Sequence, residues 1–188
     1  PEILIYSAEF AGKVKEIKAA GVAVRHCFSL GAAGTADPDF TAFVEGFDAG
    51  EPQEMSSVDL TDPLFIMYTS GTTGDPKGAV LTHLNILFGA IHSLLGYGVD
   101  RSYKSLVVAP LFHIGALAAS VTPVIYAGGS IVVSSFYNAA ETLQTICREK
   151  INYMFAVPVM YQMMADTPEW KDADLSHVHF FISGGAPI

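Results

Sequence analysis

The chain has 188 residues, 51% of them hydrophobic and only 15% charged, so it is long enough for a buried core and is not intrinsically disordered. Its net charge of −9 and isoelectric point of about 4.9 disfavour nucleic acid and anionic membranes as partners, because both attract clustered Lys and Arg. The most apolar stretch, 114–129, is interrupted by Pro123, so we expect no transmembrane segment.

Residues 1–60 are predicted to form a strand–helix–strand portion of a preceding subdomain, followed by a linker. We expect Ser7 to cap the first helix, and the polar stretch 48–62 has the composition of a linker. The predicted strands and helices of this part cover 3–6, 8–20, 22–28 and 40–47.

Residues 61–188 alternate between strand-like and helix-like stretches. Strands are predicted over 64–69, 105–109, 130–134, 152–156 and 178–182, with a short extended piece at 79–81. Helices are predicted over 82–97, 114–128, 138–150 and 158–165, with Thr82 and Asn138 as the N-caps of the first and third. Short, fully apolar strands in a repeating strand–helix order predict an α/β fold, with a mainly parallel sheet flanked by helices.

The sequence YTSGTTGDPKG, from Tyr68 to Gly78, has the composition of a phosphate-binding loop. Its three glycines, Gly71, Gly74 and Gly78, allow positive φ angles that turn backbone N–H groups inward. Hydroxyl groups and one Lys add hydrogen-bond donors and a mobile positive charge for phosphate oxygens. The candidate nucleotide-binding residues in this loop are Thr69, Ser70, Gly71, Thr72, Thr73, Gly74 and Lys77.

The loop is not the P-loop of NTPases. Counted from Gly71, the sixth position of that motif is Pro76 instead of glycine, and Gly78 replaces the metal-binding hydroxyl after Lys77. Asp75 is the only acidic residue within the loop, so an unfamiliar type of NTPase would depend on it.

Three segments in order resemble the adenylate-forming superfamily, which includes acyl- and aryl-CoA synthetases, luciferases and the adenylation domains of peptide synthetases. The loop, followed by Thr82-His83, resembles the family's signature loop. Pro110-Leu111-Phe112-His113 resembles its aromatic motif beside the carboxylate substrate, and Ser183-Gly184-Gly185-Ala186-Pro187 resembles the segment that lines the adenine and acyl sites. The resemblance is greatest to fatty-acid and aryl-acid CoA ligases.

The resemblance implies that the chain is an incomplete part of the large N-terminal domain of such an enzyme, with 61–188 as its AMP-binding subdomain. Ser70 to Lys77 would hold the leaving pyrophosphate. The further residues that the resemblance places at the nucleotide are Gly184, Gly185, Ala186 and Pro187, and those at the acid pocket are Phe112, His113 and Gly115. It also implies ATP and Mg²⁺ as cofactors, a small-molecule carboxylate as substrate and CoA as co-substrate.

The family completes its site with segments that have no counterpart in this chain, including a Glu that meets magnesium and a Lys on a separate C-terminal domain. We therefore expect a fragment without a complete catalytic set, which binds ATP weakly and forms no acyl-adenylate. A start at Pro1, an abrupt stop at Ile188 and a mean hydropathy of +0.37 favour the same interpretation. Such a fragment is expected to self-associate through apolar surface.

The acid is predicted to be fatty or aromatic. Amino-acid-activating domains usually have an Asp where this chain has His113, and residues 105–140 contain no Asp, Glu, Lys or Arg. A buried ammonium group without a carboxylate partner is unfavourable. Two alternatives stay open at this point: an amino-acid-activating adenylation domain and a non-enzymatic nucleotide-binding module.

Metal ligands and targeting signals are not apparent. His177 and His179 lie two residues apart on a predicted strand, but no third ligand is near them in sequence, so no metal site is predicted. Cys27 and Cys147 lack metal-ligand spacing and are expected to be small core residues. No targeting motif is visible, so the cytoplasm is the expected location.

Overall fold

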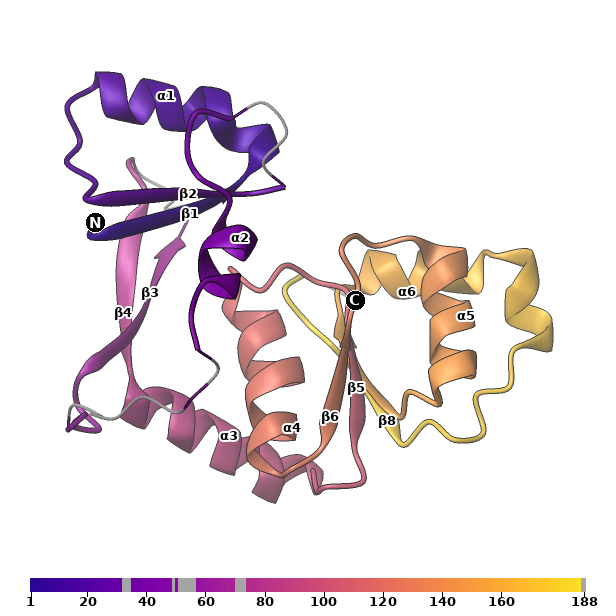
Figure 1. The fold of residues 1–188 in the computed structure, drawn as a ribbon. Coiled ribbons are helices and arrows are strands. Elements are labelled where there is room, and N and C mark those ends of the chain that lie inside the picture. The colour runs from indigo at the N-terminus through magenta and orange to yellow at the C-terminus, as the bar shows by residue number, and fades with distance from the viewer. Residues whose placement is uncertain (32–34, 49, 51–56, 70–73, 187–188) are drawn as a thin grey trace. The chain divides into compact units, whose positions relative to one another are not determined.

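The computed structural model describes residues 1–31, 35–48, 50, 57–69 and 74–186 (Figure 1). The chain divides into two compact units, Pro1–Ser56 and Ser57–Ile188. The functional division into residues 1–60 and 61–188 stays a prediction.

The first unit contains a two-stranded parallel sheet with helices. Its elements are β1 (Ile3–Ser7), the 3₁₀ turn η1 (Ala8–Phe10), α1 (Ala11–Ala19), β2 (His26–Leu30) and α2 (Phe40–Glu45). The strands pair in parallel with Ile5 opposite Phe28. The Phe28 ring packs against Phe40 and Phe43 of α2, with centroid separations of 5.7 and 4.5 Å.

Two sequence predictions for this unit need correction. Ser7 has an extended backbone, but its side chain accepts no capping hydrogen bond, because the chain enters a 3₁₀ turn before α1 begins. The second strand covers His26–Leu30 instead of 22–28, since pairing with β1 starts at His26 and continues to Leu30. Helix α2, unlike α1, has a side-chain cap: the Asp39 carboxylate accepts a hydrogen bond from the Ala42 N–H at 2.9 Å.

The second unit begins with an antiparallel hairpin and a long helix: β3 (Pro63–Thr69), β4 (Lys77–Thr82) and α3 (His83–Tyr97). Strand β3 therefore pairs within a hairpin of its own and not in the parallel sheet. The predicted cap of α3 is confirmed, because Thr82 and Asn85 form a reciprocal capping box. Gly98, with φ of 67°, ends the helix in the left-handed region.

The four-stranded parallel sheet of the second unit confirms the predicted α/β class. Its strands, β5 (Lys104–Val107), β6 (Ser130–Val133), β7 (Tyr153–Ala156) and β8 (Phe180–Ser183), lie in the order β6-β5-β7-β8. The helical elements between them are the π-helical η2 (Ala116–Val121), α4 (Thr122–Tyr126), α5 (Ala139–Glu149), α6 (Pro158–Ala165) and the 3₁₀ turn η3 (Pro168–Asp172).

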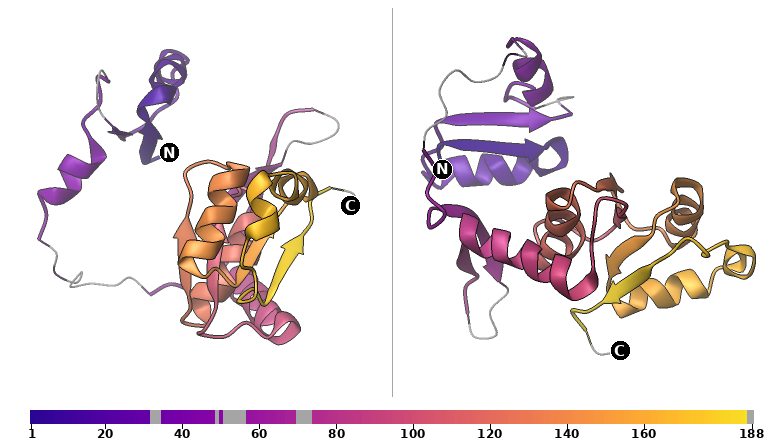
Figure 2. Two further views of the ribbon diagram at one scale, coloured as in Figure 1. Left: turned by 90° about the vertical axis from the view of Figure 1, so that its right-hand side faces the viewer. Right: turned by 90° about the horizontal axis from the view of Figure 1, so that it is seen from below.

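Helices cover both faces of this sheet (Figures 1 and 2). On the side of α5 and α6, Leu106, Ile146 and Met154 are fully buried in one cluster. On the side of α4, Val124 and Tyr153 belong to a second cluster. Within the part of the chain that the structure describes, no helix is long and apolar enough to cross a bilayer.

The helix predicted after His113 starts at Ile114, as expected, and continues through the π-helical η2, which the sequence did not predict. One further prediction for this unit is wrong in detail. The last strand begins at Phe180, so His177 and His179 precede it and form no pair on its face. The His177 ring is hydrogen-bonded through Nε2 to the Ile146 carbonyl at 3.1 Å, and the His179 ring packs edge-on against Tyr103.

Candidate functional site

The hairpin β3–β4 forms the stem of the predicted phosphate loop. The last paired residues before the loop are Tyr68 with Gly78 and Thr69 with Lys77. The Thr69 hydroxyl donates a hydrogen bond to the Lys77 carbonyl at 3.4 Å, and both residues are exposed. Two of the predicted phosphate-binding residues are therefore placed side by side at the base of the loop.

The remaining loop predictions have different outcomes. Gly74 has a φ of 153°, as expected for a residue that needs the freedom of glycine. Gly78 does not have a positive φ, so that reason for its glycine is wrong. The observed reason is space: a Cβ at Gly78 would lie 2.7 Å from Cγ2 of Ile66. Ser70, Gly71, Thr72 and Thr73 lie outside the described residues.

The aromatic motif leaves the carboxyl end of β5 as a turn. The His113 N–H donates a hydrogen bond to the Pro110 carbonyl at 3.1 Å, and the Phe112 ring lies 4.8 Å from the His113 ring. Phe112 is 73% exposed. This segment and β3 line one depression of about 420 Å³, formed by Phe65, Ile66, Met67, Tyr68, Leu111, Phe112 and Leu117. The structure therefore brings the phosphate-loop stem and the aromatic motif together.

The glycine segment after β8 lies close to the end of the aromatic motif. A Cβ at Gly115 would lie 3.0 Å from the Phe155 ring, and a Cβ at Gly184 would lie 3.6 Å from the same ring. Two predicted site residues that are 69 positions apart in sequence thus meet one side chain. Gly185 has a φ of 84°, Ala186 is exposed, and Pro187 lies outside the described residues.

Sequence analysis missed Phe155, which is the common neighbour of these glycines. It lies on β7, and its backbone N–H donates a hydrogen bond to the Ser120 hydroxyl on η2 at 3.3 Å. Its role depends on the position of β7 between β5 and β8, which no local pattern shows. The available signal was its place near the carboxyl end of a predicted parallel strand.

These segments lie at the edge of the sheet where a ligand site is expected. The strand order reverses direction between β5 and β7, and open α/β sheets bind ligands outside the carboxyl ends of strands at such a switch point. A second depression of about 520 Å³ runs from the end of β5 to the end of β6 and is lined mainly by apolar side chains. The arrangement suits an apolar ligand beside the phosphate loop.

The tyrosines beneath the site are structural. Burial raises the pKa of Tyr153 to about 12, and its hydroxyl donates a hydrogen bond to the Ala119 carbonyl. Burial also raises the pKa of Tyr161, whose hydroxyl donates to the carbonyls of Met154 and Ile182. Both hydroxyls therefore satisfy buried backbone carbonyls of the unit.

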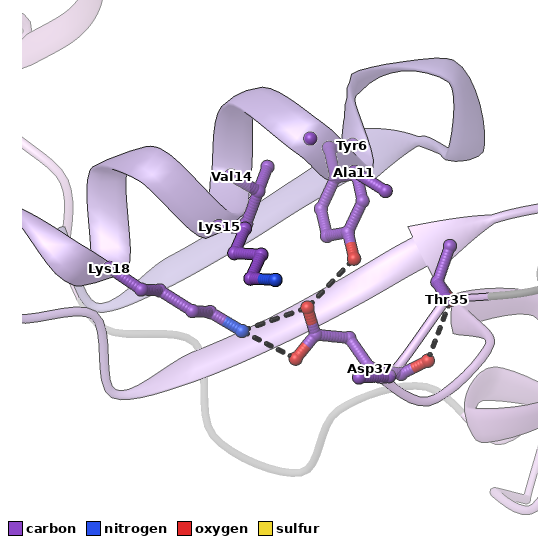
Figure 3. A pocket seen from close by; sticks show the side chains of 9 residues that line it. Tyr6, Ala11, Val14, Lys15, Lys18, Thr35 and Asp37 are labelled. Atoms are coloured by element: carbon purple, nitrogen blue, oxygen red, sulfur yellow. Dashed lines mark hydrogen bonds and ion pairs between the residues drawn. The ribbon is translucent and has the colours of Figure 1, made fainter.

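A separate cavity of about 430 Å³ lies in the first unit, between α1 and the segment before α2 (Figure 3). Asp37 accepts hydrogen bonds from the Tyr6 hydroxyl at 2.7 Å and from the Lys18 ammonium at 2.6 and 2.8 Å. Its hydrogen bond with Lys18 and then that with Tyr6 hold the pKa of Asp37 below its usual value. The charges compensate each other, and none of the predicted site residues lies here.

The AMP-binding enzyme family matches the chain over residues 1–188. A feruloyl-CoA synthase of Amycolatopsis sp is 38% identical over 138 residues, which are 73% of this chain and 28% of that protein. An indoleacetate–CoA ligase of Aromatoleum aromaticum is 37% identical over 126 residues, which are 67% of this chain and 25% of that protein. The chain thus spans about a quarter of the length of these relatives.

Solved structures show the same fold. The inhibitor-bound N-terminal domain of FACL13 from Mycobacterium tuberculosis superposes with a TM-score of 0.83 and 29% identity, over 98% of this chain and 44% of that one. ATP-bound MatB from Rhodopseudomonas palustris, at 23% identity, gives 0.79 over all of this chain and 36% of that one. Because the family matches the chain over its whole length, the chain belongs to the AMP-binding enzyme family.

Proposed function

We propose that the chain is part of an ATP-dependent ligase that joins an apolar carboxylic acid to CoA through an acyl-adenylate. The observation that carries the proposal is that β3, which leads into the phosphate loop, lines the same depression as Leu111 and Phe112 of the aromatic motif. A site for the polyphosphate and a site for the acid are therefore adjacent, as attack of a carboxylate on the α-phosphorus of ATP requires.

On the nucleotide side, the hydroxyl of Thr69 and the ammonium of Lys77 would hold the β- and γ-phosphates, together with Ser70 to Gly74. When the carboxylate oxygen bonds to the α-phosphorus, the bond to the bridging oxygen breaks and pyrophosphate leaves. A positive charge close to the departing oxygens stabilises the charge that develops on them. Among the described residues Lys77 forms no ion pair, so its charge is available for that purpose.

Magnesium is expected to bind largely through residues elsewhere in the full-length enzyme. In the described part of this chain, no three His, Cys, Asp or Glu side chains gather to hold a metal ion. The metal would therefore depend on residues outside this described part.

On the acid side, Gly115, Phe155 and Gly184 would form one wall of the pocket. The absence of charged residues between 105 and 140 favours an apolar acid, since an amino acid's ammonium would lack a partner there. Relatives named for ferulate, indoleacetate and long-chain fatty acids support the same class of substrate. CoA would then accept the acyl group from the adenylate.

Pyrophosphate exchange by the full-length enzyme that contains this chain tests the proposal. Labelled pyrophosphate should enter ATP in the presence of ferulate, indoleacetate or decanoate, and acyl-CoA should form once CoA is added. Exchange with amino acids alone would contradict the acid class, and no exchange with any acid would contradict the ligase.

We propose further that the 188-residue chain alone lacks activity and self-associates. The hairpin and α3 expose apolar side chains that a longer protein could cover, among them Ile66, Val80, Phe88 and Leu95. Light scattering should show species larger than a monomer, and the same sample should catalyse no exchange. A monomer at high concentration would refute self-association. Turnover by the chain alone would refute its lack of activity.

A further inference from the structure

A diagonal contact at the base of the phosphate loop leaves no room for a side chain at Gly78. In the β3–β4 ladder Ile66 lies opposite Val80, and Tyr68 lies opposite Gly78, so Ile66 and Gly78 are diagonal neighbours. The Ile66 side chain leans across the ladder, and its Cγ2 would lie 2.7 Å from a Cβ built on Gly78. The Tyr68 ring would lie 3.5 Å from the same position.

This contact explains the presence of glycine at position 78 better than the backbone conformation does. The φ of Gly78 is not in the left-handed region, so an alanine would be tolerated by the backbone. It would not be tolerated by Ile66, because a branch at Cβ restricts rotation about χ1 and leaves the methyl group few other positions. Relief would come from rotating Ile66 out of its rotamer or from separating the strands.

The collision between an alanine at position 78 and Ile66 would act directly on the base of the phosphate loop. Only one residue pair, Thr69 with Lys77, separates the contact from the loop, and Lys77 is bonded to Gly78. Burial does not account for the contact, since Ile66 is 61% exposed and Tyr68 is 71% exposed. A displacement of Gly78 therefore shifts Lys77 while leaving the core of the unit unchanged.

We propose that Ile66 and Gly78 are a positioning pair, in which the missing Cβ of one residue and the branched side chain of the other fix the stem that presents Lys77 to phosphate. The inference rests on the proposed ligase function. Neither side chain is required to touch the nucleotide, so the pair acts through the geometry of the loop base.

A double-mutant cycle in the full-length enzyme tests the pair, with pyrophosphate exchange and the affinity for ATP as readouts. Misplacement by about an ångström can reduce a rate by about 100-fold, so Gly78→Ala should weaken both by roughly 10- to 100-fold. Gly78→Ala combined with Ile66→Ala should recover to within about threefold of Ile66→Ala alone, because the colliding methyl group is gone.

Two matched double variants show whether the recovery is specific. Ile66→Val keeps both γ-carbons, so it should not rescue Gly78→Ala. Val80→Ala removes apolar surface from the same face without touching Gly78, and it should not rescue either. Amide hydrogen exchange at Tyr68 and Gly78 should be faster in Gly78→Ala and return towards the original rate only with Ile66→Ala.

The outcomes separate this inference from the proposed function. If the unmodified enzyme is active but Ile66→Ala fails to rescue Gly78→Ala, the positioning pair is refuted and the ligase stands. If Gly78→Ala has no effect, the pair is likewise refuted. If the unmodified enzyme exchanges no pyrophosphate with any acid, the ligase function fails, and this role of the pair fails with it. Unfolding followed by Trp170 fluorescence identifies a variant that has not folded.

Discussion

The hairpin and the four-stranded sheet of the second unit divide two tasks between them. The sheet buries its strands between helices, with Leu106 and Tyr153 at 0% exposure. The hairpin exposes Ile66 and Tyr68 on one face and contributes no member to the two buried clusters among the described residues. The sheet therefore supplies most of the buried core of the unit, while the hairpin forms the stem of the predicted phosphate loop.

This difference has a consequence for the effects of mutations. A change in the sheet alters packing first and chemistry second, because each buried side chain touches several others. A change in the hairpin can alter nucleotide binding while the unit stays folded. The proposed acid wall at Gly115 and Phe155 would lie between these extremes, since Phe155 belongs to the sheet and the wall would border the acid.

The largest expected effect is on stability, from the same kind of truncation made in both regions. Leu106→Ala should lower the free energy of unfolding by about 3 kcal/mol, because it leaves a cavity in a fully buried cluster. Ile66→Ala in the hairpin should cost less than about 1 kcal/mol, because that side chain is largely in water. Urea unfolding followed by Trp170 fluorescence measures both. Equal losses of unfolding free energy would contradict the view that the sheet, and not the hairpin, stabilises the unit.

Next in size is the effect of Lys77 on nucleotide use. Lys77→Ala should reduce pyrophosphate exchange by the full-length enzyme about 30-fold, equivalent to about 2 kcal/mol, through loss of a charge-assisted hydrogen bond to phosphate. Unfolding should be unchanged, because the side chain is exposed. Lys77→Arg should retain part of the activity, and Lys171→Ala, with the same change in net charge, should retain all of it. A large loss of stability would place Lys77 in the core instead.

Smaller still is a change in acid preference at the edge of the sheet. The methyl group of Gly115→Ala would lie 3.0 Å from the Phe155 ring, so the proposed wall of the acid pocket would have to shift. The ratio of kcat/KM for ferulate to that for a short acid should fall about 10-fold, while KM for ATP stays constant. Gly89→Ala is the control, because a Cβ there meets nothing within 4 Å. An equal loss for every acid would show that Gly115 supports packing and not selectivity.

The two regions also differ in how far sequence could predict them. The phosphate loop is predicted from a local pattern, because its glycines, hydroxyls and Lys77 are contiguous, and its role stays a prediction. The helix caps at Thr82 and Asn138 were readable because a cap depends on residues three positions away. Each depends on local chemistry, so strand order did not matter.

Predictions failed where residues distant in sequence determine the outcome. Strand β3 reads as a buried parallel strand, yet it pairs with β4, because the apolar pattern does not identify its partner. The role of Phe155 depends on the placement of β7 between β5 and β8. The glycine at 78 was predicted for a conformational reason, whereas the actual cause is the Ile66 side chain on the neighbouring strand. Strand pairing and side-chain contact decide these cases.

The smallest expected effect compares one cap from each region. Thr82→Ala removes the capping box of α3 at the end of the hairpin, and Asn138→Ala removes the cap of α5, where Asn138 accepts a hydrogen bond from the Glu141 N–H at 3.0 Å. Each should cost about 1 kcal/mol if capping is a local effect. Thr82→Ala should in addition speed amide hydrogen exchange at the start of α3, next to β4. It should slow pyrophosphate exchange by no more than about threefold, because the cap is at the opposite end of β4 from Lys77. A larger loss of pyrophosphate exchange would show that the position of the loop depends on α3 as well as on the β3–β4 ladder. The hairpin would then be less independent of the sheet than its exposed side chains indicate.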